Sequence, residues 1–283
     1  MVDRISDLPD ELLQHILCFL PTKLSFTTTV LSKRWTGLCY SLPVLRFEDE
    51  TIGYHDTFLR FCRMVNTILL SSRATNQPLK MFRVSFEDIN QNGPFNVAKW
   101  LEATKHRSIE EVHLSLCYKT LKPNIFIFQT LVVLKLERVI VGKNTSCVDL
   151  PSLKTLTLEY VYFKNWNDYI NFLNACPILE DLNVEYINTF RENVPEEALK
   201  SFTLPKLVRA SLKCLRSCTI LNFDGSENDL RFAKYILQNA SLLQDMTISV
   251  AVGSSDGMLL KINQIREELS SYPRISPKCK ISF

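Results

Sequence analysis

The sequence predicts a mixed α/β protein with three parts: a helical N-terminal segment, an irregular solenoid of repeats with parallel strands, and a C-terminal α+β module. Three observations support this fold class. Leucine occupies 41 of the 283 positions, whereas glycine occupies only 7 and average usage would give roughly 20. The chain is 46% hydrophobic, which is enough to bury a sizeable core and excludes global disorder. Many of the leucines also recur in a short apolar triplet, as repeat proteins show.

The first forty residues predict three short helices. Pro9 and the acids around it suit a helix start, because proline lacks the N–H that would have no partner there and the acids complement the positive helix end. Pro21 ends the first helix, a second is expected over residues 24–31, and Ser32 can cap a third. The apolar residues of the first helix are predicted on one face at Leu12, Leu13, Ile16, Leu17 and Leu20.

These three helices are too short to bury all their apolar side chains against one another. An exposed apolar patch on such a unit usually marks the binding site of a partner. The alternative is a plain helical subdomain that packs against the rest of the chain. The pattern alone leaves both interpretations open.

The middle of the chain repeats the template Leu-x-x-Leu-x-Leu. Successive third members lie 22, 22, 26, 28 and 36 residues apart. The first four spacings lie in or near the range of about 20–29 that leucine-rich repeats use, and the last predicts a change of module. A strand around residues 82–86 is expected to open the array. The triplets are Ile109-Val112-Leu114, Leu131-Leu134-Leu136, Leu153-Leu156-Leu158, Leu179-Leu182-Val184, Leu207-Ala210-Leu212 and Leu243-Met246-Ile248.

Each triplet is expected to form a short strand whose alternate side chains enter a common core, with neighbouring strands stacked into a parallel sheet. Helical return segments are predicted over residues 58–70, 97–101 and 166–173. The side chains that alternate outward are candidates for target binding, although their mixed charges are also typical of any solvated sheet face. They are Lys135, Glu137, Thr155, Thr157, Glu159, Asp181, Asn183 and Glu185.

The pattern changes after Cys214. Residues 224–228 predict a loop that ends in helix caps, and a helix is expected to follow through Phe232, Ala233, Tyr235, Ile236 and Leu237. A strand over 246–250 and a second helix over 258–269 follow. Residues 279–283 can form an edge strand.

Charge, cysteine usage and missing motifs exclude several classes of protein. The net charge of +3 is too small for a dedicated DNA-binding protein, and no apolar run is long enough to cross a membrane. The nine scattered cysteines indicate a reducing compartment and mostly inert thiols. Cys214 and Cys218 form a lone C-x-x-x-C, and no nucleotide, zinc-protease or hydrolase motif occurs. We therefore expect no metal, no cofactor and no catalytic residue.

Three strings in order, ISDLPDELL from Ile5, ILCFLPTK from Ile16 and VLSKRW from Val30, resemble an F-box, and more narrowly that of the plant F-box/leucine-rich-repeat/FBD family. The strings LRFAKYILQNA from Leu230 and SYPRISPKC from Ser271 are similar to its FBD module. The resemblance implies an F-box over residues 1–47, leucine-rich repeats over 48–212 and an FBD module over 214–283. The repeat strands are expected near residues 81–86, 109–116, 131–137, 153–159, 179–185 and 207–213.

The resemblance implies an intracellular, cytoplasmic or nuclear, non-catalytic subunit of an SCF-type (Skp–cullin–F-box) ubiquitin ligase. Its F-box would bind a Skp-type adaptor and through it cullin, and its repeats would bind a target protein of unknown identity. No nucleic acid or membrane partner is implied. The positions that match the family's adaptor-binding residues are Leu8, Pro9, Ile16, Leu17, Leu20, Pro21, Val30, Leu31, Arg34, Trp35 and Leu38.

Two departures from the family pattern keep an alternative open. After Trp35 the chain has Thr36-Gly37, and a glycine inside a helix costs about 1 kcal/mol relative to alanine, so the third helix is expected to be frayed and adaptor binding weaker. The array also looks abridged near residues 186–215. The alternative is a non-catalytic leucine-rich-repeat scaffold, or an abridged non-functional family member, without a ubiquitin-ligase role.

Overall fold

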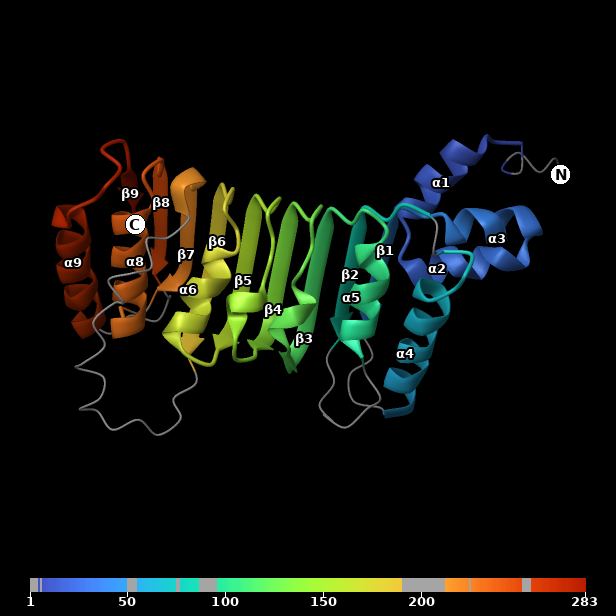
Figure 1. The fold of residues 1–283 in the computed structure, drawn as a ribbon, viewed down its shortest axis with the longest axis horizontal. Coiled ribbons are helices and arrows are strands. Elements are labelled where there is room, and N and C mark those ends of the chain that lie inside the picture. Colours follow the sequence, from blue (N-terminus) through green and yellow to red (C-terminus); the bar gives the residue numbers. More distant parts are fainter. Residues whose placement is uncertain are drawn as a thin grey trace. The chain divides into compact units, whose positions relative to one another are not determined.

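The structure is a computed structural model in which helices and parallel strands alternate along the chain (Figure 1). It divides into two compact units, Met1–Lys119 and Thr120–Phe283, which are described one at a time. The residues that it describes are 5, 7–49, 55–74, 77–86, 96–189, 212–223, 225–250 and 256–283.

The first unit begins with the predicted helices. Pro9 stands immediately before α1, and Pro21 immediately before α2, so both prolines occupy positions where no intrahelical N–H is needed. The second helix starts earlier than expected and ends in a 3₁₀ turn. Ser32 stands at the N-cap of α3, although its side chain makes no capping hydrogen bond. The elements are α1 (Asp10–Cys18), α2 (Thr22–Thr27), η1 (Thr28–Val30) and α3 (Lys33–Tyr40).

Three parallel strands follow in the same unit, in the order β1-β2-β3. The array therefore opens with β1 and not, as the sequence predicted, with the strand at residues 82–86. The signal was present, because Leu42-x-x-Leu45-x-Phe47 matches the repeat template and all three side chains are buried. The strands and helices are β1 (Val44–Asp49), α4 (His55–Leu69), β2 (Met81–Phe86), α5 (Val97–Lys105) and β3 (Glu111–Leu121), which crosses the boundary between the units.

The second unit continues with parallel strands in the order β4-β5-β6-β7-β8-β9. Helix α6 packs against β5 and α8 against β6. The strands predicted at the C-terminus thus belong to the same sheet as the repeats, and β9 is its last strand. The elements are η2 (Pro123–Ile125), β4 (Val133–Val141), η3 (Thr145–Cys147), β5 (Thr155–Phe163), α6 (Trp166–Asn174), β6 (Asp181–Thr189), η4 (Leu212–Cys214), β7 (Ser217–Phe223), α8 (Glu227–Asn239), β8 (Asp245–Val250), α9 (Asp256–Ser271) and β9 (Lys280–Ser282).

The prediction of a strand over residues 207–213 is wrong for the two of these residues that the structure describes. Residues 207–211 lie outside the described residues, and Leu212 belongs to the 3₁₀ turn η4. The strand is β7, and its buried triplet is Leu215-x-x-Cys218-x-Ile220, in which a cysteine takes the place of the second leucine. The step from Ile220 to Ile248 of β8 is 28 residues, so the repeat spacing continues into the C-terminal module.

A left-handed residue bends β4, β5, β6 and β7 at matching positions. The φ angles are 50° at Arg138, 53° at Tyr160, 52° at Tyr186 and 51° at Asn222. In β4 and β5 the buried positions change phase at this residue, so two consecutive side chains point away from the core. Because β4, β5 and β6 bend at the same register, their pairing resumes one residue later, for example between Val139 and Val161.

The buried carboxylate of Asp168 fastens the turn after β4 to the start of α6. Its Oδ1 accepts hydrogen bonds from the backbone N–H of Asn144 at 3.1 Å and of Thr145 at 3.3 Å, while the Thr145 hydroxyl donates to the backbone carbonyl of Asp168 at 2.7 Å. Its Oδ2 accepts one from Asn165 Nδ2 at 2.9 Å, while Asn165 caps α6. A buried charge is tolerated here because several donors surround it.

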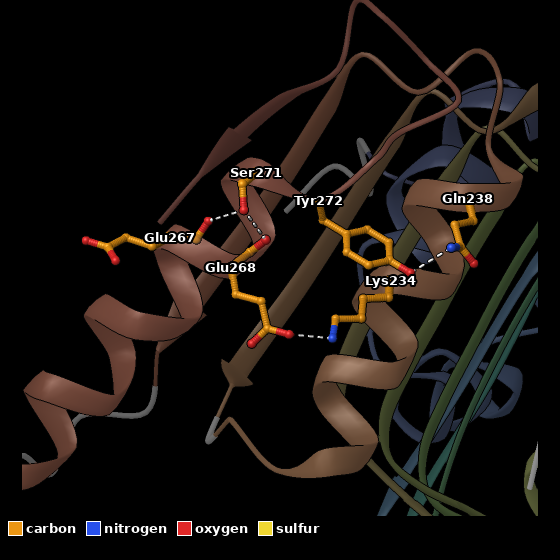
Figure 2. A network of polar contacts seen from close by, with 6 residues as sticks. All are labelled: Lys234, Gln238, Glu267, Glu268, Ser271 and Tyr272. Carbon is orange, nitrogen blue, oxygen red and sulfur yellow. Dashed lines mark hydrogen bonds and ion pairs between the residues drawn. The ribbon is translucent and has the colours of Figure 1, made fainter.

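Polar contacts and a small buried face together hold α9 against α8. Figure 2 shows Lys234 Nζ donating to Glu268 Oε1, and Gln238 Nε2 donating to the Tyr272 hydroxyl at 2.6 Å. Such exposed pairs contribute little by themselves. The predicted apolar face of this helix is confirmed at Ile265 and Leu269, which are buried, whereas the side chains of residues 258 and 262 lie outside the described residues.

All nine cysteines are free thiols. Burial raises the pKa of Cys176 far above its ordinary value and that of Cys218 to about 12. These two thiols therefore stay protonated and unreactive at neutral pH, in keeping with the inert role predicted for most cysteines.

Replacing Asp168 with alanine is expected to lower the free energy of unfolding by about 3 kcal/mol, because three donors lose a charged acceptor in a buried setting. Asp168→Asn keeps one acceptor oxygen and should cost less. Urea unfolding followed by circular dichroism measures both. The neighbouring exposed Asn167→Ala is the control, and an equal shift of the midpoint in Asp168→Ala and the control would contradict the assignment.

Candidate adaptor-binding surface

The apolar residues of α1 form two stripes, whereas the sequence predicted one face. Leu13 and Leu17 are fully buried, while Leu12, Ile16 and Phe19 are exposed at i, i+4 and i+7. The exposed fraction of Phe19 reaches 74%. One stripe therefore builds the helical core, and the other faces solvent.

The inner stripe packs with α3. Trp35, Leu38 and Cys39 of α3 are all buried. Two buried hydrogen bonds link the helices at the same place. Ser25 Oγ donates to the Leu17 carbonyl at 3.0 Å, and Cys39 Sγ donates to the Ser25 carbonyl at 3.1 Å. Desolvation raises the pKa of the Cys39 thiol, so it remains a neutral donor.

Exposed apolar side chains are concentrated in this segment. Among the described residues, eight of the fifteen large apolar side chains classed as exposed lie within the first 31 positions. Val30 is the most exposed of them, with an exposed fraction of 86%, and Leu31 follows Phe19 with 63%. Soluble proteins rarely leave so many large apolar groups together in water unless another surface covers them. These eight are Ile5, Leu12, Ile16, Phe19, Leu20, Leu24, Val30 and Leu31.

Arg34 fixes the start of α1 against α3. Its Nε and Nη2 lie 2.7 Å and 2.6 Å from Asp10 Oδ1, and Nη2 also donates to the Leu8 carbonyl. Asp10 stands in the first turn of α1, where a carboxylate also complements the helix dipole. The guanidinium group therefore orders the loop that contains Leu8 and Pro9.

Arg46 of β1 joins the helices to the first strand. Its Nη1 donates to the Cys18 carbonyl at 2.7 Å, at the end of α1. Its backbone N–H donates to Thr22 Oγ1 at 2.7 Å, and Thr22 is buried. These hydrogen bonds attach the helices with the exposed apolar side chains directly to β1.

The structure divides the predicted adaptor-binding residues into two groups. Pro9, Ile16, Leu20, Pro21, Val30, Leu31 and Arg34 are exposed, and Leu8 is half-buried. Leu17, Trp35 and Leu38 are buried and pack beneath them. The exposed Leu12, Phe19 and Leu24 were not among the predicted residues. Helical spacing could have identified Leu12 and Phe19, since both share a face with Ile16.

Two family models match the chain. The model of the F-box domain matches residues 5–47, and the model named FBD matches residues 205–248. The chain belongs to the plant F-box/FBD/LRR-repeat proteins. The F-box match ends inside β1, and the FBD match contains β7 and α8 and ends inside β8.

Relatives from Arabidopsis thaliana support this assignment. A putative F-box/LRR-repeat protein is 32% identical over 222 residues, which cover 76% of this chain and 50% of the relative. Two putative FBD-associated F-box proteins are 29% and 30% identical and cover 92% and 95% of this chain. The chain spans 50% to 65% of the length of these three relatives.

In the described parts of the F-box/FBD chain, no helix is long and apolar enough to cross a membrane. No group of three or more His, Cys, Asp or Glu side chains is placed to hold a metal ion among the residues with described positions.

Helix α3 is continuous through Gly37, so the expected fraying is not observed. A Cβ added at Gly37 would meet nothing within 4 Å. Gly37→Ala is therefore expected to stabilise the F-box by about 1 kcal/mol, because alanine restricts the unfolded chain and favours the helix. Thermal unfolding measures the change.

Gly142→Ala is the matched control for Gly37→Ala. Its Cβ would lie 3.2 Å from the Leu121 carbonyl oxygen, so this variant should gain no stability. An unchanged or lower melting temperature for Gly37→Ala would contradict the claim that glycine at this position destabilises helix α3.

Proposed function

We propose that this protein is a non-catalytic substrate receptor of an SCF-type ubiquitin ligase. In this proposal the N-terminal helices bind a Skp-type adaptor and through it cullin, and the repeats bind a target protein for ubiquitination. The observation that supports it most strongly is the concentration of exposed apolar side chains on the F-box.

The proposed contact surface consists of exposed positions. Covering a fully exposed valine or leucine contributes about 1.5–3 kcal/mol, so a few such side chains suffice for tight binding. Leu17, Trp35 and Leu38 then act from below, by holding the exposed groups in place. The proposed contacts are Leu8, Pro9, Ile16, Leu20, Pro21, Val30, Leu31 and Arg34, together with Leu12, Phe19 and Leu24.

The proposed division of labour follows the chain. Residues 1–47 would hold the adaptor, residues 48–212 would form the repeats, and residues 214–283 would form the FBD module. This chain would contribute proximity between the target and the catalytic partners, while the chemistry belongs to them. The contacts of Arg46 support such a role, because they keep the F-box in a fixed position on β1.

The free thiols fit an intracellular protein of the cytoplasm or nucleus, since reducing compartments keep cysteines unpaired. A second candidate function is a repeat scaffold, or an abridged non-functional relative, that has no ubiquitin-ligase role. Capture of the adaptor discriminates between the two.

The test is co-purification of the full chain with a Skp-type adaptor after co-expression. The wild-type chain is expected to capture the adaptor. Val30→Ser combined with Leu31→Ser should raise the Kd about 100-fold or more, because two strongly exposed apolar groups lose their burial in the complex. Isothermal titration calorimetry measures the change.

A control variant separates loss of contact from general loss of an apolar group. Leu242 is exposed on the second unit and lies far from the F-box in the sequence, so Leu242→Ser should leave adaptor binding unchanged. Circular dichroism checks that all variants keep their helix content. If the wild-type chain captures no adaptor, the receptor function is refuted and the scaffold function is favoured.

A further inference from the structure

The bend in each central strand places two consecutive side chains on the outer side of the sheet. On β5 these are Glu159 and Tyr160, and on β6 they are Glu185 and Tyr186. Glu159 and Glu185 are direct register partners, and Leu221 of β7 is the register partner of Glu185. We call Glu159, Tyr160, Glu185, Tyr186 and Leu221 the Tyr/Glu face.

The two tyrosines of the Tyr/Glu face stack on each other. Their ring centroids are 5.0 Å apart, with an angle of 28° between the ring planes. Tyr186 has an exposed fraction of 42%, and Leu221 is exposed beside it. Exposed aromatic and aliphatic groups with polar neighbours are typical of the anchor points of protein interfaces.

The charges beside the stack are negative on β5 to β8, whereas β4 contributes the cations Lys135 and Arg138 next to β5. Strands β5, β6, β7 and β8, which are neighbours in the sheet (Figure 1), contain no lysine or arginine at all. Their outward positions hold four carboxylates: Glu159, Asp181, Glu185 and Asp245. Carboxylates in register on adjacent strands repel each other, so this arrangement costs stability unless a cation neutralises it.

The protein supplies only part of that neutralisation. Lys135 Nζ of β4 lies 2.7 Å from Glu159 Oε1. The hydrogen bond that Glu185 Oε1 accepts, at 2.6 Å, comes from the neutral amide of Asn222. An incoming cation beside Glu185 would therefore gain a charged acceptor next to an exposed aromatic ring.

We propose that the Tyr/Glu face binds a basic, arginine-bearing segment of the target protein. A guanidinium group would stack on the exposed ring of Tyr186 while it donates to Glu185 or Glu159, a combination that suits arginine better than lysine. This inference rests on the proposed receptor function, because it identifies the target site with the repeats. It adds the chemical class of the target segment, which the receptor function leaves open.

The test uses the full chain co-expressed with the Skp-type adaptor and a short fluorescein-labelled peptide with arginine at every second position and serine between. Fluorescence anisotropy is expected to show binding that weakens as salt is added. A peptide with glutamine in place of arginine should not bind, and one with lysine should bind more weakly than the arginine peptide.

Variants of the Tyr/Glu face test its residues. Glu159→Gln combined with Glu185→Gln should raise the Kd for the arginine peptide at least about tenfold, because both charged acceptors are lost. Tyr186→Asn should raise it about threefold. Asparagine already occupies the equivalent left-handed position at Asn222, so this variant adds no backbone strain.

The matched control removes the same amount of charge elsewhere. Glu227 and Glu267 are exposed on α8 and α9, so Glu227→Gln combined with Glu267→Gln should change the Kd less than about twofold. Equal weakening by this control and by the face variant would overturn the proposal, as would equal binding of the glutamine and arginine peptides. Melting temperatures of the variants are measured alongside.

The same preparation separates the two proposals. If the adaptor co-purifies but the arginine peptide does not bind, the Tyr/Glu face is not a site for basic segments, whereas the receptor function stands. If the peptide binds with the expected variant effects but no adaptor is captured, the face is supported and the receptor function is refuted.

Discussion

Every strand of this protein depends on a neighbour to bury its apolar side. A single repeat offers one row of leucines on a strand and a partly covered helix, and neither closes a core alone. Stacking in register solves this, because Leu156 and Leu158 of β5 lie beside Leu134 and Leu136 of β4 and all four become fully buried or nearly so. Parallel pairing then follows, since each chain segment must return on the helical side before the next strand begins. This packing leaves the side chains on the outer side of the sheet outside the leucine core.

The sequence predicted the repeats well because their signal is redundant. A triplet that recurs in series is recognised even when one member changes, as in β6, where valine ends the triplet. The prediction from the sequence missed two strands at the expected boundaries between the F-box, the repeats and the C-terminal module. Strand β1 was overlooked because it overlaps the end of the F-box, and β7 was overlooked because Cys218 replaces the expected leucine. Both strands fit the template when burial is known.

The F-box surface was predicted in outline, but the roles of single residues were not. Periodicity shows which residues of α1 are apolar, yet adjacent stripes differ by only one position, and only packing shows that Leu13 faces inward and Leu12 outward. The bends were invisible for another reason. A left-handed φ angle is usually signalled in the sequence by glycine, but this chain has arginine, tyrosine and asparagine at the bends. The pairing of the surrounding strands compensates for the conformational strain at these residues.

Those bends have a consequence for how the outer face can vary. Their geometry follows the register of the neighbouring strands, and the side chain at the bend is not part of the leucine core. Three different residue types already occupy the four equivalent positions, with φ angles of 50° to 53°. The side chains on the outer face can thus change one strand at a time, by exchange of residues at the bends while the leucines behind them stay in place.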